Sequence, residues 1–402
     1  MNTSIDKNYL NSDFGNNQVK AYDVSFIGAG ISTSFSILGL INQLEKQPPV
    51  KPVRVAVIDQ SGEFWTGIPY GRRSGTRSLI ITSIREFLPE DERERFISWL
   101  RLNWHEAVAS RDGSGESTQQ WNNNNQCAID EGAWDELFVP RFTFGMYLKD
   151  RVAAQLAYAS NARLMTCRCI SGAVQHLTRE GTQFTLRVHD NASGDVNPIY
   201  ASKVVLALGS PPNRGASQFR PPTDATDDFR YIDDMYEPAH EMNLLRIAES
   251  LGNGSPHSLH KILIIGSNAS ALESIYTILD RPDISDRVSK MVVLSPSGEF
   301  PHKISRTTAL PRFRANHLSA LADRTDFIAG DILRAVEKDL VNAHNLGIPV
   351  ADTFPIISKG VLSALNRLNG EEQKNFVVKY GVAIGKLQRR AGRDYSEAME
   401  NL

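Results

Sequence analysis

The sequence predicts an α/β protein that contains two similar βαβ units and ends in a helical tail. Two observations support this prediction. Short β-branched strands end in glycine turns near residues 28 and 266, and an apolar helical stretch without proline follows each turn. A strand, tight turn, helix and second strand, in that order, form the opening of a parallel βαβ unit. A chain of 402 residues is long enough for two or three domains, each with its own core.

Bulk composition argues against two classes of partner. Hydrophobic residues make up 41% and charged residues 22% of the chain, which is ordinary for a globular protein. The formal net charge is -2, so no overall basic field favours nucleic acid as a partner. No apolar run approaches the ~20 residues that span a bilayer. We therefore expect no nucleic-acid partner and no membrane partner.

The N-terminus and the three cysteines predict a cytoplasmic location. Residues 1–20 are polar and rich in Asn, without the apolar core of a signal peptide, so we expect a disordered leader. Three cysteines are too few for a disulfide framework. Cys167 and Cys169 lie two apart on a predicted strand and share a face, which favours ordinary packing over a redox pair or a metal site. A reducing compartment is therefore predicted.

The first βαβ unit begins at Tyr22–Ile27, an apolar, β-branched run that ends in Gly28-Ala29-Gly30. Residues 31–44 have the apolar spacing of a helix, and Pro48-Pro49 stops that helix. Val53–Ile58 follows as a second strand of the buried type. This order predicts a Rossmann-type unit, in which two parallel strands are joined by one crossover helix.

The glycine turn of this unit suits the two phosphates of a dinucleotide. At a helix N-terminus, free backbone N–H groups and the positive end of the helix dipole face the anion. Gly28 permits the sharp turn and Gly30 lets the pyrophosphate approach, while Thr33 replaces the usual third glycine. Asp59, at the end of the second strand, is placed to hydrogen-bond the adenosine ribose. An ordinary βα turn with a surface Asp stays open as the alternative. The predicted cofactor contacts of this unit are Gly28, Ala29, Gly30, Ser32, Thr33, Asp59 and Gln60.

The middle of the chain changes from polar to β-rich. Residues 110–133 are rich in Asn, Ser, Gln and Gly, which predicts a long polar surface loop. From Leu164 to Leu206 the pattern predicts strands, with a turn at Asn191–Gly194 and a buried strand at Lys203–Leu208. Prolines at 211, 212, 221 and 222 then indicate a linker.

The second βαβ unit has a more degenerate turn. Ile262–Ile265 predicts a strand, Ala269–Leu279 a helix and Met291–Leu294 another strand. Asn268 stands where the second glycine is usual, and Asn tolerates the left-handed backbone region better than most residues. Ala271 is small enough to keep the helix close to its strand. A nicotinamide nucleotide site is favoured over a structural turn, with Gly266, Asn268 and Ala271 as predicted contacts.

The tail from Val361 onward is predicted to be helical, with interruptions near Gly370 and Gly381. No repeat of fixed period is present. The predicted divisions are a leader at 1–20, a first nucleotide-binding domain at 21–225 with a β insertion and the polar loop 110–133, a smaller second nucleotide-binding domain at 226–345, and a helical C-terminal segment at 346–402.

Five short segments resemble a bacterial FAD/NAD(P)-binding family that includes flavin-dependent urate hydroxylase and aspartate N-oxygenase. That family is similar in plan to class B flavin monooxygenases. The resemblance covers about residues 22–395 through short motifs, several of them degenerate. The segments are Gly62–Gly71, Val139-Pro140-Arg141 with Gly145-Met146-Tyr147-Leu148, Val204–Gly209 with Pro211-Pro212, Tyr231–Asp234, and Ser295–Pro301.

The resemblance implies that the first unit holds FAD and the second NADPH or NADH. Gly28, Gly30 and Asp59 would bind FAD, and the remaining implied contacts are Trp65, Thr66 and Gly67 beside the flavin, Arg141 facing a phosphate or the flavin, and Ala207, Leu208 and Gly209 closing over the cofactor. Relatives often carry an arginine for the 2′-phosphate of NADPH where this chain has Pro296 and Ser297. Lys290, Lys303 or Arg306 are candidate substitutes.

Members of that family commonly continue further and return to complete the FAD domain. The resemblance therefore implies a shortened or divergent member. It also implies a substrate pocket around Trp65–Tyr70 and the connection from Asp233 to His240.

The function that the resemblance implies is an FAD-dependent, NAD(P)H-using monooxygenase. Reduced flavin would react with molecular oxygen to form a C4a-(hydro)peroxide, which would hydroxylate a small nitrogen-containing substrate. The flavin carries such chemistry, so no catalytic side chain is assigned. Two alternatives stay open: an NAD-dependent dehydrogenase without flavin, and a non-catalytic dinucleotide-binding sensor or scaffold.

Other catalytic arrangements have little support in the sequence. A disulfide reductase is disfavoured because no cysteine pair follows the first helix. No metal-ligand spacing is present among the nine histidines. His302 and His317 are better explained as surface or satisfied core residues than as site residues. The oligomeric state is not predicted.

Overall fold

The computed structural model describes residues 21–109, 115–210, 230–252, 259–305, 310–321 and 323–400. The chain divides into two compact units that alternate along the sequence. The first unit takes in residues 1–78, 94–112 and 139–250, and the second takes in residues 79–93, 113–138 and 251–402. The predicted boundaries at 225 and 345 stay predictions. The predicted leader and the proline-rich linker lie outside the described residues.

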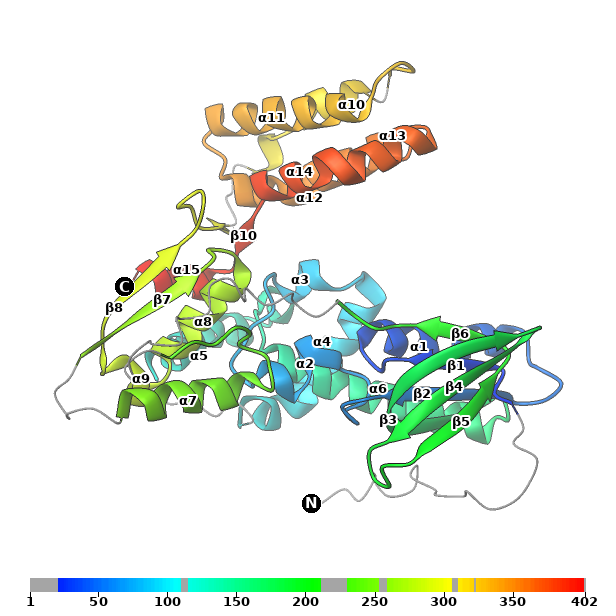
Figure 1. Cartoon of the computed structure of the whole chain (residues 1–402). Coiled ribbons are helices and arrows are strands. Elements are labelled where there is room, and N and C mark those ends of the chain that lie inside the picture. Colours follow the sequence, from blue (N-terminus) through cyan, green and yellow to red (C-terminus); the bar gives the residue numbers. More distant parts are fainter. Residues whose placement is uncertain are drawn as a thin grey trace, which may run out of the picture. The chain divides into compact units, whose positions relative to one another are not determined.

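The first unit is built on a six-stranded sheet in the order β5-β4-β3-β2-β1-β6 (Figure 1). The strands are β1 (Val24–Ile27), β2 (Val53–Asp59), β3 (Met165–Glu180), β4 (Gln183–Asp190), β5 (Val196–Ala201) and β6 (Val204–Leu206). Strands β3, β2, β1 and β6 run parallel, and β4 and β5 are antiparallel to their neighbours. The predicted α/β class and its β insertion are confirmed.

Helices α1 and α6 cover one face of this sheet (Figure 1). Ile37 and Ile41 of α1 are fully buried and lie one turn apart, as an apolar helical stripe requires. They share a core with Val55 and Val57 of β2 and with apolar residues of α6. The helices of this unit are α1 (Ile31–Lys46), α2 (Gly67–Tyr70), most of α4 (Glu90–Ala109), α6 (Arg141–Asn161) and α7 (His240–Gly252).

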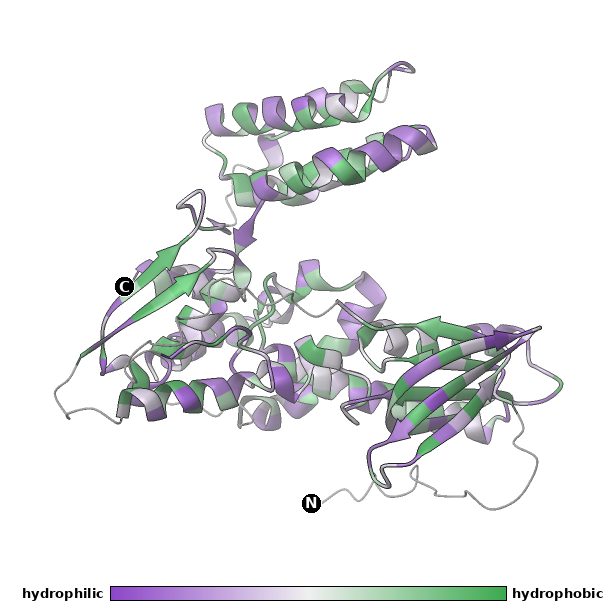
Figure 2. Ribbon diagram, viewed as in Figure 1, coloured by the Kyte–Doolittle hydropathy of each residue, from purple (hydrophilic) through white to green (hydrophobic). Residues whose placement is uncertain are grey.

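The antiparallel strands cover part of the second face of the sheet. Ala56 and Ile58 of β2 form another core with Leu186 of β4 and Ile199 of β5, so the sheet curls. Apolar and polar residues alternate along β3, β4 and β5 (Figure 2), as expected for strands with one buried and one wet face. Cys167 and Cys169 lie on β3 and pack against the first core, as predicted for ordinary packing.

Strand β6 corrects one prediction. A buried strand was expected at Lys203–Leu208, but β6 covers only residues 204–206 and is the edge strand of the sheet. Leu206 is 61% exposed and Leu208 66% exposed. An apolar run in a single sequence does not distinguish a central strand from an edge strand, because both carry the same residue types.

The second unit contains the predicted second strand–turn–helix–strand segment. Strands β7 (His260–Ile265) and β8 (Val288–Leu294) pair in parallel, and α8 (Ala269–Leu279) connects them with the short α9 (Pro282–Ser285). The helix bounds agree with the sequence prediction. Ile275 and Tyr276 of α8 are buried, whereas Leu263 and Leu294 on the strands are more than half exposed. Both strands are strongly hydrophobic (Figure 2).

The Asn-rich segment is a helix, not the predicted surface loop. Residues 116–130 form α5 (Glu116–Asp130), and residues 110–114 lie outside the described residues. Trp121 is buried and its indole N–H donates to the Phe138 carbonyl (2.7 Å). The Asp280 carboxylate accepts from the Thr118 N–H and hydroxyl (2.7 Å each). These contacts with distant residues stabilise a helix that local composition does not favour.

The C-terminal part of the second unit is a helical module with its own core (Figure 1). Its helices are α10 (Asn316–Leu321), α11 (Ala329–Asn345), α12 (Phe354–Leu365), α13 (Gly370–Asn375) and α14 (Gly381–Leu387), with a π-helical turn at Phe376–Tyr380. The predicted helical tail is confirmed and begins earlier than Val361. Gly370 and Gly381 begin α13 and α14, so the predicted interruptions are helix starts.

Two short strands and further helices complete the second unit. Strand β10 (Arg390–Ala391) pairs in parallel with β9 (His302–Lys303), a contact that the sequence analysis missed. The remaining helices are α3 (Ile84–Phe87) and α15 (Arg393–Glu400). Within the described ranges, no helix is long and apolar enough to cross a membrane.

Candidate functional site

The first glycine turn is enclosed by the strand that follows the β insertion. Gly28 has φ +101°, and its N–H donates to the Ile58 carbonyl (2.8 Å). A Cβ at Gly28 would lie 2.1 Å from the Ala207 carbonyl oxygen. The Ala207 N–H in turn donates to the Ile27 carbonyl (2.8 Å). Glycine is therefore required at position 28 by both backbone conformation and space.

The open end of helix α1 lies against a second glycine. Gly30 is the N-cap residue of α1, with φ -80° and ψ -171°, and no side chain in the described part of the chain caps the helix. A Cβ at Gly67 would lie 3.1 Å from the Gly30 Cα, so the two backbones touch. The first-turn N–H groups of α1 thus remain as donors for an anion.

The Asp59 carboxylate is fixed at the end of β2 beside this turn. One oxygen accepts from the Ala29 N–H (2.8 Å). The other accepts from the N–H (2.8 Å) and hydroxyl (2.5 Å) of Ser61. Each carboxylate oxygen has more than one acceptor direction, so this half-buried group retains capacity for ribose hydroxyls.

Thr33 occupies the position of the usual third glycine. Its side chain is fully buried, and its hydroxyl donates to the Gly28 carbonyl (2.7 Å). The hydroxyl therefore satisfies a carbonyl of the turn itself. The sequence indicated a departure from the fingerprint at Thr33 but not this bond, because the two residues meet only when the turn and helix are formed.

Trp65, Thr66 and Gly67 are tied to the same turn. The Trp65 N–H donates to the Ala29 carbonyl (2.7 Å), and the Ser34 hydroxyl donates to the Trp65 carbonyl (2.7 Å). Trp65 has φ +79°, which is unusual for a bulky residue. The Thr66 hydroxyl is buried without a hydrogen-bond partner among the described residues. Strained backbone and an unsatisfied polar group are features that gather at ligand sites.

The remaining predicted contacts of the first unit vary in position. Ser32 is an exposed residue of the first turn of α1. Gln60 is exposed, and its carbonyl accepts from the Asn191 side-chain amide (2.9 Å). Leu208 is exposed and Gly209 has φ +71°, so the chain turns directly after β6. The structure brings the Gly28–Gly30 turn, Asp59, Trp65–Gly67 and Ala207 together at the carboxyl ends of β1, β2 and β6.

Arg141 lies in a cluster of aromatic side chains and ionisable groups. Its guanidinium carbon is 5.9 Å from the ring centroid of Tyr236, which stacks on His240 with centroids 5.8 Å apart. Burial lowers the pKa of His240 to about 4, and the charges of Arg141 and Arg77 contribute. Burial raises the pKa of Tyr70, against the opposing effect of Arg141. The predicted pocket segments, Trp65–Tyr70 and Asp233–His240, therefore meet at Arg141.

Two ion pairs hold the 236–241 segment in place. Arg77 is buried and donates to both carboxylate oxygens of Glu241 (2.8 Å each). Arg73 donates to the Tyr236 carbonyl (3.1 Å) and pairs with Glu237. The Asn243 amide donates to three backbone carbonyls between residues 234 and 237, at 3.0–3.1 Å. Sequence reasoning missed these residues, since charged and amide side chains carry no local signal of such pairing.

The second turn has the same form in the second unit. Gly266 has φ +108°, and its N–H donates to the Leu294 carbonyl (2.8 Å). Asn268 is the N-cap of α8 with φ -95° and ψ -169°. The prediction that its tolerance of the left-handed region matters was wrong, because only Gly266 has positive φ there. Ala271 is buried in α8, as expected for close packing.

The loop after β8 carries hydroxyl groups and an acid. The Ser267 hydroxyl donates to the Glu299 carbonyl (2.7 Å), which ties this loop to the turn. The Ser295 hydroxyl accepts from the Gly298 N–H (3.1 Å). Of the candidate cations, Lys303 pairs with Glu400 (3.2 Å), Lys290 is exposed on β8, and Arg306 lies outside the described residues.

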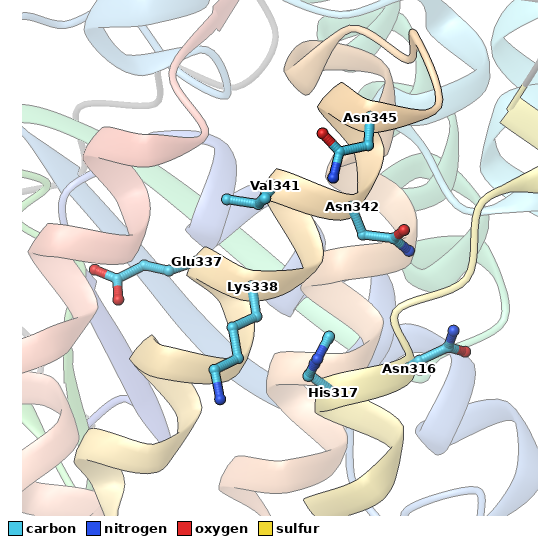
Figure 3. Close-up of a pocket in the computed structure, with 7 residues that line it drawn as sticks. All are labelled: Asn316, His317, Glu337, Lys338, Val341, Asn342 and Asn345. Atoms are coloured by element: carbon cyan, nitrogen blue, oxygen red, sulfur yellow. The ribbon is translucent and has the colours of Figure 1, made fainter.

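An open depression of about 510 Å³ lies on the helical module (Figure 3). His317 and Lys338 are among the residues that line it. The His317 Nδ1 lies 2.8 Å from Asp339 Oδ1, and the Asp339 carboxylate also accepts from the backbone N–H groups of His317 and Leu318 (3.0 Å each). Asp339 thus caps α10, which supports the structural interpretation of His317. Within the described ranges, no group of three or more His, Cys, Asp or Glu residues could hold a metal ion.

Comparisons with solved structures give remote likenesses. An ornithine N-hydroxylase from Kutzneria sp. 744 is 15% identical, with 93% of this chain and 71% of that chain covered and a TM-score of 0.40. An ornithine hydroxylase from Pseudomonas aeruginosa is 13% identical, with 93% and 73% covered and a TM-score of 0.41. A lysine monooxygenase from Nocardia farcinica is 14% identical, with 68% and 61% covered and a TM-score of 0.36. These TM-scores are too low for a residue-by-residue comparison.

Sequence comparison gives a firmer result. Residues 25–211 match the model of a family described as FAD-NAD(P)-binding. Two similar proteins are Uncharacterized protein Rv3403c from Mycobacterium tuberculosis and Uncharacterized protein Mb3437c from Mycobacterium bovis, each 31% identical over 383 residues. The match covers 95% of this chain and 70% of each relative. The chain therefore belongs to the family of these mycobacterial proteins.

Proposed function

We propose that this protein is an FAD-dependent, NAD(P)H-using monooxygenase that hydroxylates a nitrogen atom of a small amine. The observation that carries the proposal is the enclosed first turn. There the open N-terminus of α1, the Asp59 carboxylate and the Trp65–Gly67 segment lie together. A helix N-terminus binds phosphate, and an acid at the end of the next strand binds ribose.

The choice of FAD rather than NAD for this turn rests on two supports. Residues 25–211, which match the FAD-NAD(P)-binding family, include every first-turn contact described above. The second unit contains a second turn of the same backbone form, where a nicotinamide nucleotide would bind. A flavin and a nicotinamide site in one chain fit an enzyme in which a nicotinamide reduces the flavin.

The nature of the reaction is inferred from the names of structural neighbours. Those proteins are an ornithine N-hydroxylase, a lysine monooxygenase and a cadaverine monooxygenase. They share a primary amine as substrate, and molecular oxygen is the co-substrate of a monooxygenase. The resemblance to urate hydroxylase and aspartate N-oxygenase widens the candidates to purines and other amino acids. NADPH is the first nicotinamide to test, although Pro296 and Ser297 leave NADH as the alternative.

An absorbance spectrum of the purified protein tests the flavin. A bound flavin gives a band near ~450 nm, and anaerobic NADPH or NADH should bleach it. Gly28→Ala should prevent FAD uptake, because its Cβ would lie 2.1 Å from a backbone oxygen. Gly181→Ala is the matched control: Gly181 also has positive φ, but no atom in the described part of the chain lies within 4 Å of its Cβ position.

Oxygen consumption then tests the reaction. In the presence of reduced nicotinamide, the correct amine should stimulate oxygen uptake and give one hydroxylamine for each nicotinamide oxidised. A protein that does not take up added FAD would refute the proposal. A flavoprotein that neither nicotinamide bleaches would favour a non-catalytic sensor or scaffold instead.

A further inference from the structure

Helices α2, α4 and α6 bring aromatic rings of the first unit together (Figure 1). The rings that form this aromatic cluster are those of Tyr70 on α2, Phe96 and Trp99 on α4, and Phe144 and Tyr147 on α6. Where two of these rings are in contact, their centroids are 5.0–6.3 Å apart, the separation of packed aromatic pairs. Every ring contacts at least one other, so the cluster is continuous.

The inner end of the aromatic cluster is held next to the first nucleotide turn. Gly67, the first residue of α2, touches Gly30 of that turn, and Tyr70 follows three residues later. A Cβ at Gly145 would lie 1.9 Å from the Tyr70 carbonyl oxygen, so the backbones of α2 and α6 are in contact. Because Phe144 is the neighbour of Gly145, this contact places the Tyr70 and Phe144 rings edge to face, with centroids 5.3 Å apart.

The outer end of the aromatic cluster lies at the protein surface. Phe144, Tyr147 and Asp150 follow one another along α6 at i, i+3 spacing, so each is adjacent to the next on the helix surface. The half-buried Trp99 ring packs against Tyr147, with centroids 5.8 Å apart. Its indole N–H donates to the exposed Asp150 carboxylate (2.9 Å). The cluster therefore runs from the nucleotide turn to a tryptophan whose N–H proton has an acceptor at the surface.

The rings of the cluster differ in how readily they lose an electron. Indole and phenol groups are oxidised by one electron far more easily than the phenyl ring of phenylalanine. The oxidisable members are Tyr70, Tyr147 and Trp99. Phe144 lies between Tyr70 and Tyr147, in contact with both rings at 5.3 and 5.8 Å. Tyr147 contacts Trp99 directly. An electron leaving Trp99 can thus reach Tyr70 in two short steps.

The surroundings of Tyr70 and Trp99 give this transfer a direction. Oxidised phenol and indole groups are stabilised by loss of a proton. Burial raises the pKa of Tyr70, so its phenol holds its proton, and the nearby Arg141 charge disfavours a further positive charge. At Trp99, by contrast, the Asp150 carboxylate is in place to accept the indole proton. A missing electron is therefore more stable at Trp99 than at Tyr70.

We propose that Tyr70, Tyr147 and Trp99 carry oxidising equivalents from the first nucleotide turn to the protein surface. A one-electron oxidant beside Tyr70 gains an electron that comes finally from Trp99. The Trp99 indole proton passes to Asp150, which leaves a neutral tryptophan radical. A soluble thiolate then returns one electron to Trp99 and Asp150 returns the proton, while the thiyl radicals pair as disulfides. Reactive oxygen species released by a monooxygenase are such oxidants, so the biological need for this path rests on the proposed function.

Illumination of the FAD-loaded full chain tests the path without any turnover. Blue light makes a bound oxidised flavin a one-electron oxidant, and electron paramagnetic resonance at low temperature detects the radical that remains on the protein. Incorporation of tryptophan deuterated on the indole ring should change the shape of the signal, which identifies a tryptophan radical. Trp99→Phe should abolish that signal. A flavin-loaded wild-type protein that forms no tryptophan radical would overturn the proposal.

A second tryptophan provides the matched control. Trp134 is half-buried, as Trp99 is, but lies in the second unit. Trp134→Phe should therefore retain the radical signal in full. A signal that survives in Trp99→Phe would place the radical on another tryptophan, such as the buried Trp65 beside the turn, and would equally overturn the proposal.

Two further variants test the steps of the path. Tyr147→Phe keeps the ring but removes the oxidisable phenol, so most of the Trp99 radical should be lost. Asp150→Asn still accepts the indole N–H bond but takes up no proton. The Trp99 radical should then decay faster, and its decay should lose its dependence on heavy water. Circular dichroism confirms that both variants fold. Unchanged yield and decay in both would contradict the assigned path.

An absorbance spectrum taken before illumination separates this proposal from the proposed function. A protein that takes up no FAD overturns both, because the path then has no oxidant at its inner end. A flavin that both nicotinamides fail to bleach, in a protein that forms the Trp99 radical, refutes the monooxygenase and leaves the path standing. A flavin that a nicotinamide bleaches, in a protein without the Trp99 radical, overturns the path alone.

Discussion

The two glycine turns have nearly the same backbone but different surroundings. Gly28 and Gly266 have φ +101° and +108°, and the N-cap residues Gly30 and Asn268 both have extended ψ, -171° and -169°. Around Gly28, the Ala207 carbonyl fills the place of a Cβ, whereas no atom of the described residues lies within 4 Å of the same place at Gly266. Local sequence therefore determines the turn, and distant strands determine whether the turn is enclosed.

Equivalent positions in the two turns also carry different side chains. The Gly28 and Gly266 N–H groups donate to the carbonyls of Ile58 and Leu294, so Asp59 corresponds to Ser295. Thr33, five residues after Gly28, corresponds to Ala271, five after Gly266. The first turn thus has an acid and a buried hydroxyl where the second has neither. Two turns with nearly the same backbone can therefore offer different chemical groups to a ligand, because the residues around them differ.

The largest expected effect is a difference in stability between alanine variants of Gly28 and Gly266. Gly28→Ala should lower the free energy of unfolding by about 4 kcal/mol, since it combines a positive φ with overpacking against backbone. Gly266→Ala, with open space, should cost only about 1–2 kcal/mol for the backbone conformation. Urea denaturation measures both. Equal losses would show that the enclosure of Gly28 has no energetic consequence.

The buried imidazole of the first unit should make stability depend on pH. His240 has a folded pKa of about 4 against 6.5 for an ordinary histidine, so the unfolded chain binds its proton first as pH falls. Stability from this group is complete above pH 6.5 and is lost toward pH 4, by about 1.4 kcal/mol per pH unit and about 3 kcal/mol in all. The difference in unfolding free energy between wild type and His240→Gln should change by that amount. Parallel pH profiles would contradict it.

Replacing Asp59 of the first turn by serine, the residue type at the corresponding position of the second turn, tests whether Asp59 binds the cofactor. Asp59→Ser should weaken FAD binding about 10- to 100-fold, since the ribose would lose a charge-assisted acceptor. Fluorescence titration of the FAD-free protein gives the dissociation constant. Asp190→Ser is the matched control: Asp190 also accepts two backbone N–H groups in a turn of the same unit, and its loss should leave FAD affinity unchanged.

The smallest expected effect is that of removing the buried Thr33 hydroxyl. Thr33→Ala, which copies Ala271, should cost about 1 kcal/mol because the bond to the Gly28 carbonyl is lost. It should also weaken FAD binding slightly, as the turn becomes less fixed. Thr277→Ala removes a comparable buried hydroxyl, which bonds the Glu273 carbonyl in α8, and should cost similar stability without affecting FAD. If both variants affect FAD equally, Thr33 has no special part in the turn.

Much of the fold could be predicted because its signals are local. Helix α8 was predicted with its observed bounds, since an apolar stripe, a glycine turn and the absence of proline all lie within it. Helix α5 was missed because its stability comes from Trp121 and from Asp280, a residue far along the chain. The edge position of β6 was missed because sheet order depends on the whole sheet.

The candidate site also contains residues with a local sequence signal and residues without one. The glycines and Asp59 were predicted from spacing, because a phosphate-binding turn requires them in one short stretch. The meeting of Tyr70, Arg141 and His240 was implied only by resemblance, since each of these residues lies 71 positions or more from the others. The ion pairs of Arg73 and Arg77 with α7 and the residues before it carried no sequence signal at all.

The late closure of the first turn has a consequence for synthesis on the ribosome. Gly28 is made well before the Ala207 carbonyl that encloses it, because the two residues lie about 180 positions apart. The first unit also needs α7, which ends at residue 252. A nascent chain therefore holds an unfinished glycine turn and open strands until α7 has been made, and dinucleotide capture by this turn follows that step rather than starting the folding of the unit.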